Sequence, residues 1–200
     1  AQLMEKIFGN EISSLKFFKF DYFNFNKKKY LISRSGFSKQ GGFEIHTDNI
    51  KSALELYDHF FEIGDEFNLK PGTPNHPERI EGGLLSYGSD MDIFDNPFEC
   101  GFDKYVDLNS DIVFLGKENL KKIKNQGIKK KIMGVKIDSK FIDVSQGIPM
   151  LDLKNYEIGQ LRSAAYSPKF DKVVGIAMIK KDFCIKSQKF KVKSNDNSFT

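Results

Sequence analysis

The sequence predicts an α+β fold that is followed by a small C-terminal β-barrel, and three observations carry this prediction. Strand-like runs in residues 15–47 precede a long amphipathic helix, and that order is typical of a helix packed on a sheet. After Gly127 the composition changes, and several short strand-like runs alternate with Gly, Pro, Asn and Asp. A size of 200 residues with 40% hydrophobic content, including 20 Phe, is enough for a real core.

The first elements follow from residue spacing. Apolar residues at helical spacing near the start indicate a helix, and residues 15–25 alternate as a strand. Phe18, Phe20, Tyr22 and Asn24 would share one face of this strand, with Phe17, Phe23 and Phe25 on the other. Residues 30–33 and 43–47 are two more strands. Asp48 or Asn49 then caps a helix over 50–67, whose buried stripe is expected to be Leu54, Tyr57, Phe60, Phe61 and Ile63.

The middle of the chain is broken by Pro71, Gly72, Pro74 and Pro77. We expect a short helix over 78–87, an acidic turn-rich stretch over 90–97 and a helix over 114–125. Strands are expected in the C-terminal region at 132–137, 147–153, 157–165, 173–179 and 190–192. A domain boundary near Gly127 therefore separates residues 1–127 from 128–200.

Composition excludes several classes of protein. The net charge of +4 is modest, and only Arg34, Arg79 and Arg162 among the 31 basic residues are Arg. Lys is the usual solubilising surface residue, so no nucleic-acid partner is expected. Cys100 and Cys184 lie far apart in sequence and match no metal spacing. A disulfide framework is not expected from two such cysteines, which favours a reducing cytoplasm. No apolar run has transmembrane length, and no membrane partner is expected.

One segment, residues 33–45, is the most informative. Gly36, Gly41 and Gly42 form a loop between two strands, where the backbone can approach a flat ligand closely. Glu44 follows between Phe43 and Ile45, and strand alternation points its side chain away from theirs. The alternative is a long hairpin loop with an ordinary exposed Glu.

Two other segments are weaker signals on their own. Residues 79–92 contain Asp90 and Asp92, which are either an acidic turn, the favoured interpretation, or a carboxylate pair. Residues 96–102 contain Glu99 and Cys100, but no His lies close in sequence. His46, His59 and His76 have no catalytic spacing and are interpreted as structural or surface residues; no metal site and no catalytic residue are assigned.

Taken in order, these segments resemble the glycine-cleavage T-protein (aminomethyltransferase) family, and most closely its dimethylsulfoniopropionate demethylase branch. Residues 33–45 are similar to its strand–loop–strand ending in Gly-Phe-Glu-Ile. Residues 79–92 resemble its Arg-Leu-Glu-Ala-Gly…Tyr-Gly…Asp segment, and residues 96–102 its Thr-Pro-x-Glu-x-Gly-Leu segment. Residues 114–118 resemble its Phe-Ile-Gly-Lys-Glu helix start. Residues 38–42 are Ser-Lys-Gln-Gly-Gly where aminomethyltransferases usually have Thr-Gly-Glu-Asp-Gly, and this difference favours the demethylase branch.

The resemblance implies three domains around a central hole that holds tetrahydrofolate, of which this chain carries part of the α+β region and the barrel. Because the chain begins with Ala1, within an expected helix, we expect an N-terminal part of a longer protein to precede it. The resemblance assigns Glu44 to the pterin ring, which a carboxylate can bind by accepting two N–H groups. Arg34, Phe37 and Tyr87 are the other expected folate contacts. The family's folate-binding Arg has no match: Asn75 or His76 falls near its place, whereas Arg79 matches a structural Arg.

The resemblance implies a demethylase that passes a methyl group from dimethylsulfoniopropionate to tetrahydrofolate. Its partners would be folate and a small-molecule sulfonium, with no metal; the oligomeric state is not readable from the sequence. Three alternatives stay open: an aminomethyltransferase that acts on a lipoyl-bound carrier protein, a folate-binding module without catalysis, and an unrelated α+β protein.

Overall fold

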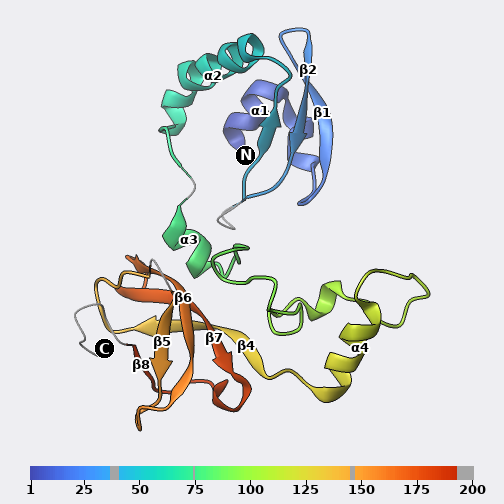
Figure 1. The fold of residues 1–200 in the computed structure, drawn as a ribbon. Helices are drawn as coiled ribbons and strands as arrows, with labels where there is room; N and C mark the ends of the chain where they lie inside the picture. Colours follow the sequence, from blue (N-terminus) through green and yellow to red (C-terminus); the bar gives the residue numbers. More distant parts are fainter. Residues whose placement is uncertain (37–40, 74, 145–146, 193–200) are drawn as a thin grey trace. The chain divides into compact units, whose positions relative to one another are not determined.

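The computed structural model describes residues 1–36, 41–73, 75–144 and 147–192 (Figure 1). The chain divides into two compact units, Ala1–Asn75 and His76–Thr200. Each unit has its own sheet and its own buried apolar cluster. The expected domain boundary near Gly127 stays a prediction.

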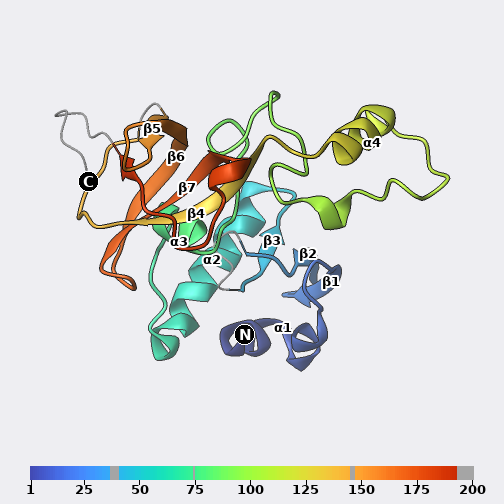
Figure 2. The ribbon, with the colours of Figure 1, turned by 90° about the horizontal axis from the view of Figure 1, so that it is seen from below.

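The first unit is a three-stranded antiparallel sheet with helices on one side (Figure 1). The strands are β1 (Phe20–Phe25), β2 (Lys28–Ser33) and β3 (Glu44–His46), in the order β1-β2-β3, which Figure 2 shows side by side. The helical elements are α1 (Gln2–Phe8), η1 (Asn10–Ser14), α2 (Ile50–Gly64) and η2 (Asp65–Phe67). All three predicted strands and the long helix are present, although β1 begins five residues later than expected.

One face of this sheet carries the core of the first unit. Alternation buries Phe23 and Phe25 of β1 with Tyr30 and Ile32 of β2, and leaves their sequence neighbours on the opposite face. The helical side of the cluster is supplied by Met4, Phe8, Ile12, Leu15 and Leu56. The opposite face of the sheet therefore remains open within the described residues of this unit.

The expected buried stripe of α2 is partly wrong. Leu54 and Tyr57 are exposed, whereas Ser52, Leu56 and Gly64 are the buried residues of the helix. The helix has two apolar stripes with helical spacing, and periodicity alone cannot select between them. Packing selects the stripe that contains Leu56, since that stripe meets the core of the first unit.

The second unit contains a five-stranded antiparallel sheet of order β4-β7-β6-β5-β8. Its strands are β4 (Lys130–Ile137), β5 (Ile148–Leu151), β6 (Glu157–Ser167), β7 (Lys172–Lys180) and β8 (Lys191–Val192). Its helical elements are α3 (His76–Glu81), η3 (Asp103–Tyr105), α4 (Lys117–Gln126) and η4 (Lys181–Phe183). The helix expected over 78–87 ends at Glu81, because Gly82 and Gly83 follow and Gly83 has a φ of 63°.

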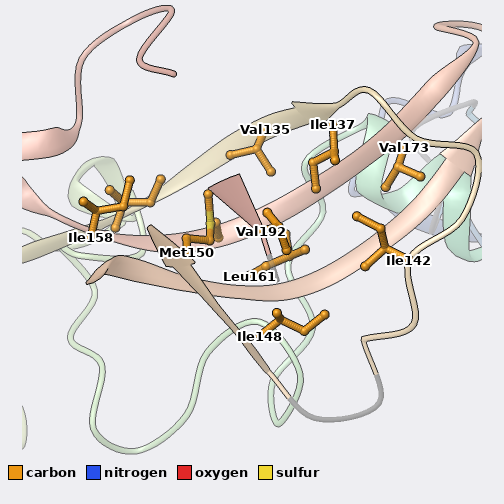
Figure 3. Close-up of a cluster of buried hydrophobic side chains, with 11 residues drawn as sticks. Val135, Ile137, Ile142, Ile148, Met150, Ile158, Leu161, Val173 and Val192 are labelled. Atoms are coloured by element: carbon orange, nitrogen blue, oxygen red, sulfur yellow. The ribbon is translucent and has the colours of Figure 1, made fainter. Parts of the chain in front are cut away.

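The core of the second unit lies against one face of this sheet (Figure 3). Val135 and Ile137 of β4 share one apolar cluster with Met150 of β5, Leu161 of β6 and Val192 of β8. The two strands at the ends of the order thus bury side chains in the same core. Five predicted strands are confirmed as one antiparallel sheet; its closure into a barrel stays a prediction.

Candidate functional site

Glu44 stands at the start of β3, where the register of the first unit fixes its direction. Ile45 pairs with Ile32 on the core face, so Glu44 and its partner Ser33 point to the open face. Phe43 and Ile45 pack against the core whereas Glu44 is exposed, as alternation predicted. Its Oε2 lies 3.4 Å from the Ser33 hydroxyl, which donates to it. The carboxylate therefore keeps most of its capacity to accept hydrogen bonds from a ligand.

The glycines that flank this loop are required by the backbone. A Cβ on Gly36 would lie 3.0 Å from the carbonyl oxygen of Gly41, and Gly41 has a φ of 79°. Both conditions favour glycine, because it has no Cβ and enters positive φ without strain. Phe37, an expected folate contact, lies outside the described residues, as do Ser38, Lys39 and Gln40.

Arg34 follows β2 directly and is held by the chain of the first unit. Its Nη1 donates to the carbonyl oxygens of Leu15 at 2.9 Å and Ser13 at 3.4 Å. The guanidinium also lies over the Phe43 ring, 5.3 Å from the ring centroid. The structure thus places Arg34 and Glu44 in the same unit. Arg34 contacts the ring of Phe43, which directly precedes Glu44 in sequence. Its role as a folate contact stays a prediction.

Tyr87 lies in the second unit, on an exposed turn. The turn closes by a bridge between Tyr87 and Met91, with the Gly88 N–H donating to the Met91 carbonyl oxygen at 2.8 Å. The two units are described separately, so the structure does not place Tyr87 relative to Glu44. Its role as a folate contact also stays a prediction.

Asp90, interpreted from sequence as part of an acidic turn, is a fully buried ion-pair partner. Arg79 Nη1 donates to Asp90 Oδ2 at 2.6 Å, and the Ser86 N–H donates to the same oxygen at 2.7 Å. Arg79 Nη2 reaches Ser163 Oγ at 3.2 Å, which ties α3 and the turn to β6. Asp90 Oδ1 is buried without a hydrogen-bond partner among the described residues. This pair is structural, in agreement with the role that the resemblance gave Arg79.

Sequence reasoning missed a second buried ion cluster, which is centred on Asp95. Its carboxylate accepts from Lys130 Nζ at 2.5 Å, from the Arg162 guanidinium, and from the Asp92 N–H at 3.0 Å. Burial by itself would raise the pKa of Asp95, but the hydrogen bonds from Arg162 and Lys130 outweigh it and lower the pKa from 3.8 to about 2. The one available signal was that Arg162 is an isolated Arg in a strand of a Lys-rich chain.

The weak nucleophile-and-base interpretation of Glu99 and Cys100 finds no support in the geometry. Cys100 is buried, and burial together with the nearby Asp95 charge raises the pKa of its thiol to about 11. Glu99 is also buried, and its Oε2 accepts from the Asn96 N–H at 3.3 Å. A buried thiol with a raised pKa carries little thiolate at neutral pH, which disfavours a nucleophilic role.

The three histidines belong to three different elements. His46 is exposed on β3, His59 lies in α2 with its ring 4.9 Å from that of Phe25, and His76 opens α3. Burial and the neighbouring Arg79 charge lower the pKa of His76. Within the residues that the structure describes, no group of three or more His, Cys, Asp or Glu side chains could hold a metal ion.

A comparison with protein-family models identifies the family of this chain. The family model described as the GCVT N-terminal domain matches residues 1–110, more than half of the chain. The chain belongs to the glycine-cleavage T-protein family. The family match thus includes both Glu44 in the first unit and the Arg79–Asp90 pair in the second.

Curated members of the family match at about one third identity. Dimethylsulfoniopropionate demethylase DmdA of Ruegeria pomeroyi is 34% identical over 88% of this chain and 48% of its own length. An aminomethyltransferase of Thermoanaerobacter pseudethanolicus is 33% identical over 89% of this chain and 48% of its own length. The chain therefore spans about half the length of the curated relatives it matches.

A solved member of the T-protein family shares the fold. The glycine cleavage system aminomethyltransferase T of Bartonella henselae superposes with a TM-score of 0.74 at 20% identity, over 85% of this chain and 46% of that chain. The mixed helix and sheet fold expected from the sequence is thus the fold of this family. In the residues that the structure describes for the present chain, no helix is both long and apolar enough to span a bilayer.

Proposed function

We propose that this protein binds tetrahydrofolate through Glu44 and acts in folate-dependent transfer of a one-carbon group. The observation that carries the proposal is the exposed Glu44 carboxylate, which a T-protein-family chain presents on the open face of a sheet between two inward-facing apolar residues. A carboxylate can accept two hydrogen bonds at once, and the edge of a pterin presents adjacent N–H donors. The residues present therefore suit the pterin. Arg34, Phe37 and Tyr87 belong to the same proposal as further contacts.

The methyl donor that we propose is dimethylsulfoniopropionate. Its support is the 34% identity with the Ruegeria pomeroyi demethylase, together with Ser38, Lys39 and Gln40 in the loop before Glu44. Tetrahydrofolate supplies the nucleophilic N5. The S–CH₃ bond breaks as an N5–CH₃ bond forms, the bonding electron pair returns to sulfur, and N5 loses its proton to solvent. The products are methylmercaptopropionate and 5-methyltetrahydrofolate.

The task left to the protein in this reaction is positioning. The leaving group is a neutral thioether, so a metal or redox group is not needed for the electron balance. Holding donor and acceptor in line and excluding water supplies much of the rate in such transfers. Glu44 would fix the pterin edge and so the direction of N5.

The experiment combines activity with a matched pair of variants. The longest form of the protein that carries this chain is incubated with tetrahydrofolate and dimethylsulfoniopropionate, and both products are quantified. Glu44→Gln should lower kcat/KM by about 10- to 100-fold, because it removes a charged acceptor. Glu62→Gln, on the exposed side of α2, is the control and should leave it unchanged. Folate binding without either product would rule out the demethylase.

The second candidate is an aminomethyltransferase. It is favoured by the 33% identity with the Thermoanaerobacter pseudethanolicus protein, nearly equal to that of the demethylase. The discriminating substrate is an aminomethyl-loaded lipoyl carrier protein in place of the sulfonium. Release of ammonia with formation of 5,10-methylenetetrahydrofolate would assign this reaction.

The proposal also includes the C-terminal barrel and the cellular location that were expected from the sequence. The shared core of β4 and β8 supports closure of the C-terminal sheet into a barrel. A cytoplasmic location is supported by the two cysteines, which are both free thiols.

A further inference from the structure

The open face of the sheet in the first unit is a single mixed surface. Strand register lines up two rows across it: Phe20, Ser33 and Glu44 in one row, and Tyr22, Leu31 and His46 in the next. These six residues are called the outer sheet face. Phe20 is 68% and Tyr22 60% exposed, whereas their neighbours Phe23 and Phe25 are buried on the other side.

The chemistry of the outer sheet face changes from one edge to the other. Glu44 and His46 on β3 are polar, Ser33 and Leu31 on β2 lie in the middle, and the two aromatic rings stand on β1. Neighbouring strands are about 4.8 Å apart, so Glu44 lies about 10 Å across the sheet from Phe20. Along β1, Phe20 and Tyr22 are separated by about 7 Å. This backbone spacing is comparable with the length of a bicyclic ring.

This distribution favours a flat ligand that carries N–H groups at one end. The carboxylate accepts from the polar edge of such a ligand, and aromatic rings provide a stacking or edge-to-face contact for the rest. A lipid surface would be disfavoured, because the carboxylate lies in the same face as the rings. Two adjacent exposed aromatics on the same rigid sheet face as a carboxylate are also a composition that suits recognition of a ligand rather than solvation.

We propose that Tyr22 and Phe20, with Leu31 between them and Glu44, bind the pterin ring whose edge Glu44 holds. The assignment rests on the proposed function, and it adds residues of β1 and β2 to the folate contacts that the sequence had assigned. The aromatic pair binds ring atoms and not the glutamate tail. These residues should therefore affect the binding of ligands that contain the pterin and not of ligands that lack it.

The test measures binding by isothermal titration with two probes, on the longest form of the protein that carries this chain. Tetrahydrofolate carries the pterin, whereas N-(4-aminobenzoyl)glutamate lacks it. Tyr22→Ala should weaken tetrahydrofolate binding by about tenfold, the size of effect that loss of a stacked ring commonly has. Tyr22→Phe should restore wild-type affinity, since the ring and not the hydroxyl makes the contact. The affinity for N-(4-aminobenzoyl)glutamate should be the same in all forms.

Tyr57→Ala is the matched control. Tyr57 has a similar exposure of 54% and lies in α2 of the same unit, outside the outer sheet face. Its removal should leave both affinities unchanged. Sedimentation velocity on the same variants reports whether the face is instead covered by a second copy of the chain.

The outcomes separate this inference from the function on which it rests. If the wild-type protein, in the longest form that carries this chain, does not bind tetrahydrofolate, both fail. If it binds and Glu44→Gln weakens binding while Tyr22→Ala does not, the proposed function stands and the aromatic site is wrong. If Tyr22→Ala changes the sedimentation coefficient but not the affinity, the face serves self-association and the inference is overturned.

Discussion

Two carboxylates of this chain, Glu44 and Asp95, have opposite surroundings. Glu44 is exposed beside one hydroxyl, while the side chain of Asp95 is 0% exposed and receives hydrogen bonds from two cationic groups and a backbone N–H. The buried carboxylate is stabilised as a charge, and it holds Lys130 and Arg162 in place in return. The exposed carboxylate keeps acceptor capacity for a ligand. The two side chains carry the same chemical group, and their surroundings differ: Asp95 is structural, whereas Glu44 is the residue that we propose for folate binding.

The Asp95 cluster predicts a pH dependence of stability. The folded-state pKa of about 2 lies below the ordinary 3.8, so this contribution is present above pH 4 and is lost as the pH falls toward 2. The shift corresponds to about 2 kcal/mol. Asp95→Asn should lower the free energy of unfolding by about 3 kcal/mol at pH 7, because it leaves two cations without their partner.

The measurement is chemical unfolding of wild type and Asp95→Asn at several pH values. The difference between them should narrow between pH 4 and pH 2. Asp182→Asn, at an exposed position in η4, is the control and should behave as wild type. A difference that stays constant across this range would contradict the assignment.

At the scale of elements, α2 shows how a local signal and packing combine. Asn49 is the N-cap, with extended backbone, and its side-chain oxygen accepts from the Ser52 N–H at 2.8 Å. The sequence left Asp48 and Asn49 as equal choices, and the structure selects Asn49. The same first turn is tied to β2, where Lys28 Nζ lies 3.1 Å from Ser52 Oγ and 2.7 Å from Glu55 Oε2.

Removal of this cap should destabilise the first unit. Asn49→Ala is expected to lower the free energy of unfolding by about 1 kcal/mol, since one helix N–H loses its acceptor. Asn49→Asp retains an acceptor and should lose less than about 0.5 kcal/mol. Hydrogen exchange at the first turn of α2 checks the mechanism, and equal stability of the two variants would argue against a capping role.

At the scale of the whole molecule, ligand binding and stability are linked. A ligand that binds only the folded chain stabilises it by about 2.7 kcal/mol at a concentration 100 times its Kd. Tetrahydrofolate should therefore raise the Tm of the wild-type chain and do so much less for Glu44→Gln. A rise of the same size in both forms would place the folate elsewhere than at Glu44.

The sequence predicted elements well and their burial less well. All five strands of the C-terminal sheet and all three strands of the first unit were predicted, because their periods and turn residues are local signals. Burial of α2 was partly wrong, since two apolar stripes compete and only the neighbouring core selects one. Asp95 was missed because its partners Lys130 and Arg162 lie 35 and 67 residues away in sequence.

The sequence by itself determined the family, the identity of the strands and the outward direction of Glu44, since each depends on residue order and on the two-residue period of a strand. Only the tertiary structure decided which residues share a face with Glu44. Strand register pairs Phe20 with Ser33 and Ser33 with Glu44. These pairings depend on hydrogen bonds between strands, and the residue type at one position does not predict them. The proposed aromatic contacts share a face with Glu44 because β1, β2 and β3 lie side by side in the sheet.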